Sequence, residues 1–144
     1  MNPLLFTCAL AVALTATAAD KPGSAKVTGA VITSKTVKNY SGLTLELRLY
    51  EYHPFIADKP ADLVAKLNLK NYAHKAGKET KTQFTIGEDG KIKPGMSYYL
   101  TCFVIDAKDK RYLMGEKDGK RGLCKVLTGG NPNKVNLILR DLRK

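Results

Sequence analysis

The chain has 144 residues, and its 24 lysines and arginines against 13 aspartates and glutamates give a formal net charge of +11. This length favours one domain with a sizeable core. The composition excludes a disordered chain, a coiled coil, a polytopic membrane protein and a small disulfide-rich knot. Three cysteines and two histidines form no metal-ligand cluster along the sequence, so we expect no zinc site.

The N-terminus has the pattern of an export signal. Residues 4–14 form an apolar run that is too short to span a bilayer, and small residues follow at positions 16–18 with the spacing that a signal peptidase recognises. We therefore predict a signal peptide over residues 1–18, a short mobile leader over residues 19–25 and one domain over residues 26–142. The mature protein is expected in the periplasm or secreted, with no transmembrane span.

A lipid anchor is not expected. Cys8 follows Thr7, whereas a lipobox has a small glycine, alanine or serine before its cysteine and a longer apolar run before that. We predict that Cys8 is removed with the signal peptide.

Two cysteines remain in the predicted mature chain, Cys102 and Cys124. In an oxidising compartment an even pair favours one disulfide, here closing a loop of about 22 residues and stabilising the fold by about 3 kcal/mol in the chain-entropy model. The alternative is a pair of buried free thiols.

The clearest structural signal lies in residues 43–50, where four leucines alternate with polar or amphipathic residues. A period of two describes a strand with one dry face, whereas a helix would spread these leucines around its circumference. Residues 97–106 are apolar at both alternating sets of positions, which is typical of a central strand covered on both sides. Further strands are expected at residues 26–37, 63–69, 80–86, 111–114, 123–127 and 135–139.

Turn residues separate these segments, as at Gly42, Gly90 and Gly95, and no stretch has a sustained helical period. The sequence therefore predicts an all-β fold, a single-domain antiparallel β-sandwich of about seven or eight strands.

Four stretches follow one another as they do in a known family. Val27, Gly29 and Val31 form a V-x-G-x-V strand, and the alternating strand at residues 45–50 leads into Ile56-Ala57-Asp58-Lys59-Pro60-Ala61, close to L-A-D-x-P-A. The third and fourth stretches are the P-G-x-x-Y strand from Pro94 to Asp106, and the closing V-L-T-x-G and V-x-L-x-L at residues 126–130 and 135–139.

Over residues 26–140 the chain thus resembles the YscW-type family of type III secretion lipoprotein chaperones, together with the YbaY-like envelope lipoproteins. The resemblance implies a small β-sandwich in the bacterial envelope. For the named member of the family it also implies a pilotin role, which is to help a secretin ring reach the outer membrane.

Catalytic chemistry has little support in the sequence. His53 and His74 stand in expected loops without a nucleophile motif around them, and no phosphate-binding glycine loop is found. We expect exposed loop histidines, no cofactor and no enzymatic activity. A hydrolase that uses one of these histidines is the remaining alternative.

Two features point to binding. The lysine-rich charge attracts anionic surfaces or an acidic partner, or alternatively only keeps the domain soluble. Tyr50, Tyr52 and Phe55 lie close together around one loop and form either a binding patch or a small core that packs this loop onto the sheet.

We therefore predict an exported, non-enzymatic envelope binding or chaperone-like protein. Its expected partner is another envelope protein or an acidic surface or glycan, not nucleic acid, and binding would use the aromatic loop or an exposed sheet edge that accepts a strand. The alternative function is a basic periplasmic module that binds a polyanion or glycan.

Overall fold

The alternating segments form strands in the computed structural model, which describes residues 23–142. In β2 the leucines at positions 45, 47 and 49 point inward and are fully buried, while the residues between them face outward. No helix occurs in residues 23–142, and so none that could span a membrane. The strands are β1 (Val27–Thr33), β2 (Tyr40–Tyr52), β3 (Asp62–His74), β4 (Thr80–Ile86), β5 (Ser97–Ile105), β6 (Arg111–Lys117), β7 (Lys120–Arg121), β8 (Cys124–Val126) and β9 (Lys134–Asp141).

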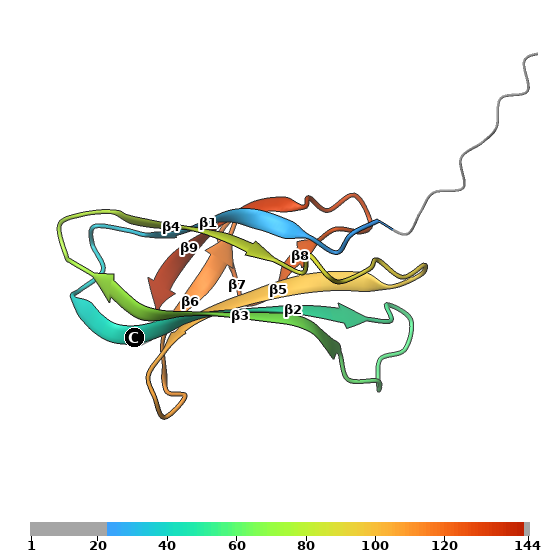
Figure 1. The fold of residues 1–144 in the computed structure, drawn as a ribbon, viewed down its shortest axis with the longest axis horizontal. Coiled ribbons are helices and arrows are strands. Elements are labelled where there is room, and N and C mark those ends of the chain that lie inside the picture. Colours follow the sequence, from blue (N-terminus) through green and yellow to red (C-terminus); the bar gives the residue numbers. More distant parts are fainter. Residues whose placement is uncertain (1–22, 143–144) are drawn as a thin grey trace, which may run out of the picture.

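The strands form one continuous sheet in the order β3-β2-β5-β6-β9-β1-β4, with β7 paired to β6 and β8 paired to β5. The sheet folds over so that β4, β1 and β9 lie above β3, β2 and β5 (Figure 1). The edge strands β3 and β4 are consecutive in the chain and meet at their connecting loop, so the sheet is nearly closed. The predicted all-β fold is confirmed.

One pairing departs from the antiparallel pattern. Strands β1 and β9 run parallel, with Gly29 opposite Val135. A side chain at Gly29 has no room, because a Cβ there would lie 1.6 Å from the Val135 carbonyl oxygen. Alternating hydrophobicity describes which face of a strand is buried, but it does not encode the direction of a partner more than 100 residues away, so the parallel pair was not predicted.

The core lies between the two layers of the folded sheet. Leu47 of β2 and Leu100 of β5 are fully buried, as are Val31 of β1 and Leu137 of β9 from the opposite layer. Both layers thus contribute aliphatic side chains to one cluster, which is the main source of stability in such folds.

Strand β5 is central, as its two apolar faces predict. It pairs with β2, β6 and β8. Its outward residues Phe103 and Ile105 are also buried, and the Arg111 guanidinium lies 4.0 Å from the centre of the Phe103 ring. The second apolar face is therefore covered by side chains of the same layer.

The connecting loops gather at two ends. The register brings Thr33 opposite Thr80, Tyr40 opposite His74 and Ile105 opposite Arg111. Loops 34–39, 75–79 and 106–110 therefore share one end, called here the lysine end; in Figure 1 the first two lie at the far left and loop 106–110 lies below them. Loops 53–61, 87–96 and 127–133 share the opposite end, called the pocket end.

The packed part of the chain begins before β1. The Ala25 amide donates to the Gly90 carbonyl at 2.9 Å, and Ser24 bridges to Lys91. Ala25 is fully buried, so the last residues of the predicted mobile leader belong to the fold. The predicted signal peptide, Cys8 and residues 19–22 lie outside the described residues.

Candidate binding site: an aromatic patch and its pocket

Three tyrosines meet on the outer face of the sheet at the pocket end. Because the alternating leucines of β2 point inward, Tyr50 and Tyr52 point outward, and the register places Tyr99 of β5 opposite Tyr50. The Tyr50 and Tyr99 rings stack with centres 5.1 Å apart, and the Tyr52 ring lies 5.7 Å from Tyr99. Burial, together with the neighbouring Tyr50 and Tyr52, raises the pKa of Tyr99, so its hydroxyl remains a hydrogen-bond donor.

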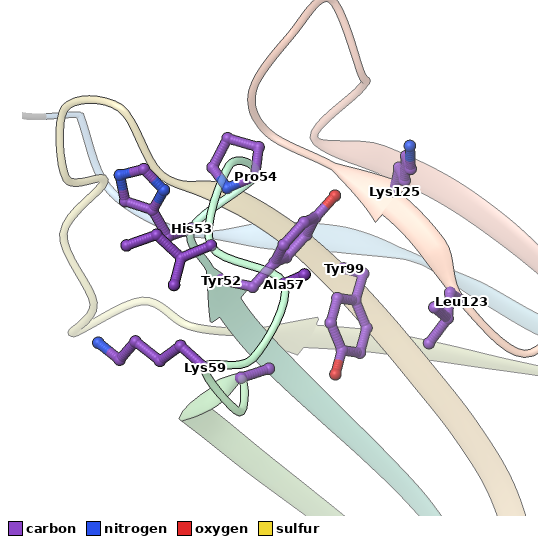
Figure 2. Close-up of a pocket in the computed structure, with 10 residues that line it drawn as sticks. Tyr52, His53, Pro54, Ala57, Lys59, Tyr99, Leu123 and Lys125 are labelled. Atoms are coloured by element: carbon purple, nitrogen blue, oxygen red, sulfur yellow. The ribbon is translucent and has the colours of Figure 1, made fainter.

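A pocket of about 340 Å³ opens beside these rings. Figure 2 shows Tyr52 and Tyr99 between loop 53–61 on one side and Leu123 with Lys125 on the other. The volume is within the range of sites that accept a small ligand or one or two side chains. The lining consists of Tyr52, His53, Pro54, Ile56, Ala57, Lys59, Ala61, Tyr99, Leu123 and Lys125.

Exposed apolar side chains extend this surface. Phe55 is 89% exposed and Leu123 is 62% exposed, and Ile56 and Leu63 are about half exposed. Leu63 pairs with Tyr50 across β3 and β2, at a register shift that turns it outward. We call Tyr50, Tyr52, Tyr99 and these four residues the aromatic patch. Contiguous apolar side chains on a soluble surface mark interaction sites.

The predicted cluster of Tyr50, Tyr52 and Phe55 is thus only partly brought together. Tyr50 and Tyr52 share the patch, but Phe55 points into solvent from the loop and does not pack that loop onto the sheet. Sequence reasoning missed Tyr99 and Leu123. Tyr99 lies in a strand with apolar residues on both of its faces, so nothing in the sequence shows which of its side chains face outward.

Two lysines carry positive charge at the pocket. Lys59 and Lys125 both line it, and Lys125 lies opposite Tyr99 across β8 and β5. Lys59 has one carboxylate neighbour, Asp62, at 3.5 Å, and both side chains are more than half exposed. The pocket therefore joins an apolar floor to an accessible cationic rim.

The buried carboxylate of Glu46 holds Arg48, which in turn contacts Tyr50 of the patch. Glu46 is only 3% exposed although it lies on the outer face. Its two oxygens lie 2.8 Å from Arg48 Nε and 2.8 Å from Lys66 Nζ, and Arg48 Nη1 also donates to the Tyr50 hydroxyl at 3.4 Å. Burial alone raises the pKa of Glu46, but hydrogen bonds from Lys66 and Arg48 outweigh it and hold the pKa below its usual value.

A second polar network fixes the end of β2. The Tyr98 hydroxyl donates to Glu51 Oε2 at 3.2 Å and accepts from the Lys93 amide at 2.8 Å. The Lys93 ammonium forms an ion pair with the same carboxylate. Burial raises the pKa of Tyr98, so its hydroxyl stays protonated. This network ties loop 87–96 to β2 next to Tyr52.

Both histidine rings form hydrogen bonds within the fold. His74 is 4% exposed, and its ring nitrogens lie 2.8 Å from the Thr80 hydroxyl and 3.1 Å from the Val37 carbonyl. The expectation of an exposed loop position is wrong for His74, because β3 extends five residues beyond the alternating segment. His53 Nδ1 accepts from the Phe55 amide at 3.3 Å. Among residues 23–142, no group of histidine, cysteine and acidic side chains is placed to hold a metal ion.

The predicted disulfide is not formed in this structure. Cys102 and Cys124 are free, buried thiols. Their positions explain the result: Cys124 is opposite Leu100 on β5, so Cys102 is its diagonal neighbour. Diagonal residues on paired strands lie about 7–8 Å apart, beyond the usual span of a disulfide. Burial raises the pKa of both thiols, most strongly at Cys102.

An open sheet edge is also present. Strands β3 and β4 each pair on one side only, and a groove of about 410 Å³ lies between them. Its lining includes the charged or polar residues Lys66, Thr85, Glu88 and Asp89. The groove is therefore more polar than the aromatic patch.

These features define a small all-β protein with a pocket and exposed apolar side chains at one end of its sheet. One solved structure has a similar fold: an alternative pilotin from the type II secretion system of Vibrio cholerae. It is 20% identical to this chain, with a TM-score of 0.56, and the match covers 83% of this chain and 97% of the pilotin. No protein-family model and no curated protein matches the chain.

Proposed function

We propose that this chain is a non-enzymatic escort of the pilotin kind, which binds a protein of a secretion system through its aromatic patch. The observation that carries the proposal is the pocket lined by Tyr52 and Tyr99 together with the exposed side chains of Ile56 and Leu123. The shared fold with a type II secretion pilotin supports the same role. The signal-like N-terminus supports work in the envelope.

The partner's chemistry follows from the patch. An apolar side chain of the partner fills the pocket, and a neighbouring carboxylate meets Lys59 or Lys125 at the rim. Interfaces of this kind obtain most of their affinity from a few buried aromatic or aliphatic contacts, while rim charges set orientation and association rate. No bond is made or broken, which agrees with histidines engaged in structural hydrogen bonds.

The finer assignment is that the escorted protein is a secretin subunit, as in the YscW-type family. It is supported by the ordered sequence stretches and by the pilotin fold. The two supports name different secretion systems, type III for the family and type II for the solved structure, and the proposed role is the one that they share.

The test is titration of the purified chain against the purified secretin subunit of the same organism. Leu123→Asp places a charge in the patch at a side chain that is 62% exposed, so the fold tolerates it. We expect a loss of affinity on the order of 30-fold or more, as for a central interface residue. The matched control is Asn136→Asp, which adds the same charge to an exposed position of β9 in the other layer. Equal binding by the two variants would remove the patch from the proposal.

A second candidate is the binding of an acidic glycan. The stacked Tyr50 and Tyr99 rings offer a flat surface for a sugar, and Lys125 lies beside them. Retention on an acidic-glycan column that falls with salt and is lost in Tyr99→Ala would support this candidate. Retention unchanged by that substitution would contradict it.

A further inference from the structure

The lysine end has an excess of positive charge that the pocket end lacks. Its three loops hold six exposed lysines against three carboxylates, whereas the three loops of the pocket end hold three lysines against three carboxylates. The lysines of the lysine end are Lys35, Lys38, Lys75, Lys78, Lys108 and Lys110.

None of these six lysines takes part in an ion pair with another residue of the described part of the chain. One of the three carboxylates is engaged inside its loop, because Asp106 accepts hydrogen bonds from the amides of Lys108 and Lys110 at 2.8 and 3.0 Å and from the Tyr112 hydroxyl at 3.1 Å. The lysine end therefore keeps an unneutralised field.

The three loops are held as one surface. The Gly77 amide donates to the Lys35 carbonyl at 2.8 Å and the Ala76 amide to Asn39 Oδ1 at 2.8 Å, which joins loops 75–79 and 34–39. Tyr40 and Tyr112 pack edge to face with centres 5.8 Å apart, with Lys38 over the first ring at 5.8 Å and Lys110 over the second at 5.5 Å. This pair links loops 34–39 and 106–110.

The lysine end has no exposed large apolar side chain of the kind that forms the centre of a protein interface. The exposed large apolar side chains of residues 23–142 are Phe55, Ile56, Leu63 and Leu123, and all of them lie in the aromatic patch. Protein interfaces bury an apolar centre inside a polar rim. Lysine also acts as a mobile point charge, which suits a diffuse layer of phosphates better than the bidentate recognition of single carboxylates.

We propose that the lysine end docks on a bilayer surface that contains anionic phospholipids. The lysines lie within a Debye length of the headgroup phosphates, and the attraction needs no shape complementarity. In this arrangement the pocket end faces away from the bilayer, and the aromatic patch stays accessible. The proposal stands on the charge of the lysine end and does not depend on the partner of the patch.

The experiment measures binding of the mature chain, without the predicted signal peptide of residues 1–18, to vesicles of equal amounts of phosphatidylglycerol and phosphatidylcholine, with pure phosphatidylcholine vesicles as reference. The test variant is Lys35→Gln/Lys75→Gln/Lys78→Gln. Its control is Lys91→Gln/Lys120→Gln/Lys134→Gln, which removes the same charge from exposed lysines outside the lysine end that are also in no ion pair. Thermal unfolding confirms that both variants are folded.

We expect binding to the anionic vesicles only. Each lysine near the surface contributes about five-fold, so the test variant loses about 100-fold in affinity and the control much less. Binding should also disappear as the Debye length falls from about 10 Å to about 3 Å at high salt. Equal losses in the two variants, or no vesicle binding at all, would overturn the proposal. Binding to soluble polyglutamate without binding to vesicles would overturn it in favour of an acidic protein.

Discussion

The two ends of the molecule differ in chemistry although one sheet carries both. At the pocket end apolar side chains are exposed, and charges such as Lys93 and Glu51 are paired. At the lysine end none of the six lysines forms an ion pair with a described residue, and no large apolar side chain is exposed. The loops can diverge because the strands, not the loops, form the core. Exposed apolar surface and excess positive charge are thus separated along the length of this fold.

The separation has a physical consequence. Apolar contact of the kind proposed for the pocket end is not screened by salt, whereas the attraction proposed for the lysine end weakens with ionic strength. Substitutions at each end and in the sheet between them test this difference.

The largest effect is expected from a substitution that separates two paired strands of the sheet. In Gly29→Ala the new Cβ would lie 1.6 Å from the Val135 carbonyl oxygen, so strands β1 and β9 must separate. This oxygen belongs to the backbone and cannot rotate away as a side chain can. We expect a loss of about 3 kcal/mol or more in the free energy of unfolding, measured by urea denaturation.

The matched control is Gly23→Ala, whose Cβ meets only the end of Ile92 at 3.7 Å. It should change the free energy of unfolding by less than about 0.5 kcal/mol. Equal stability of the two variants would contradict the parallel pairing of β1 with β9.

The next effect separates paired charge from unpaired charge. Glu46→Gln leaves Arg48 and Lys66 without their carboxylate. Since Lys66 is partly exposed, we expect a loss of about 2 kcal/mol, below the value for a fully buried pair. Lys78→Gln at the lysine end should be neutral within about 0.5 kcal/mol, because it removes an unpaired charge. Similar losses in both variants would mean that the lysines of the lysine end also have stabilising partners.

The pH dependence of stability tests the role of the Glu46 charge with Glu46→Gln alone. The pKa of Glu46 in the folded chain is below its usual value of 4.5, so its contribution is complete above about pH 4.5. The contribution is lost as pH falls from 4.5 through the lower folded-state pKa. In acid the difference between wild type and Glu46→Gln should therefore shrink. A constant difference would exclude Glu46 ionisation as its cause.

The sequence predicted the strands well because the signal is local. The leucines of residues 43–49 specify the buried face of β2 without reference to any other strand. Asn71 shows the limit: with φ at 60° it is part of the register shift that turns β3 back into pairing with β2. A polar residue at such a position reads as the end of a strand, so the extension of β3 to His74 was missed.

The site was less predictable because it depends on register. Tyr50 and Tyr52 are close in sequence, but the wall of the pocket comes from Tyr99, Leu123 and Lys125. These residues join the tyrosines only because β5 lies between β2 and β8. Which residues become neighbours across three strands depends on how the sheet assembles, and the pattern of a single sequence does not show it.

A smaller effect concerns the wall that β8 forms at the pocket end. Because Cys102 and Cys124 are free, Cys124→Ala and Cys102→Ala each remove only a buried sulfur and should cost about 1 kcal/mol. The double variant should cost about the sum. A native disulfide would instead give a loss of about 2–5 kcal/mol in either single variant and no further loss in the double variant. Thiol titration of the chain without residues 1–18 checks the same point, with the thiols of Cys102 and Cys124 expected to react only after denaturation.

The smallest change in stability is expected at Asp109 of the lysine end. Asp109 has φ at 59°, a left-handed conformation that glycine adopts freely, and its carboxylate opposes the surrounding lysines. Asp109→Gly should leave the free energy of unfolding within about 0.5 kcal/mol of wild type, because the relieved backbone offsets the greater chain entropy of glycine. The same variant should bind anionic vesicles about five-fold more tightly. Asp118→Gly, at φ 51° between β6 and β7, removes the same charge outside the lysine end, together with its ion pair to Lys117, and should gain much less. If both variants gain equally, total charge governs the attraction, and the two ends do not differ in the way described.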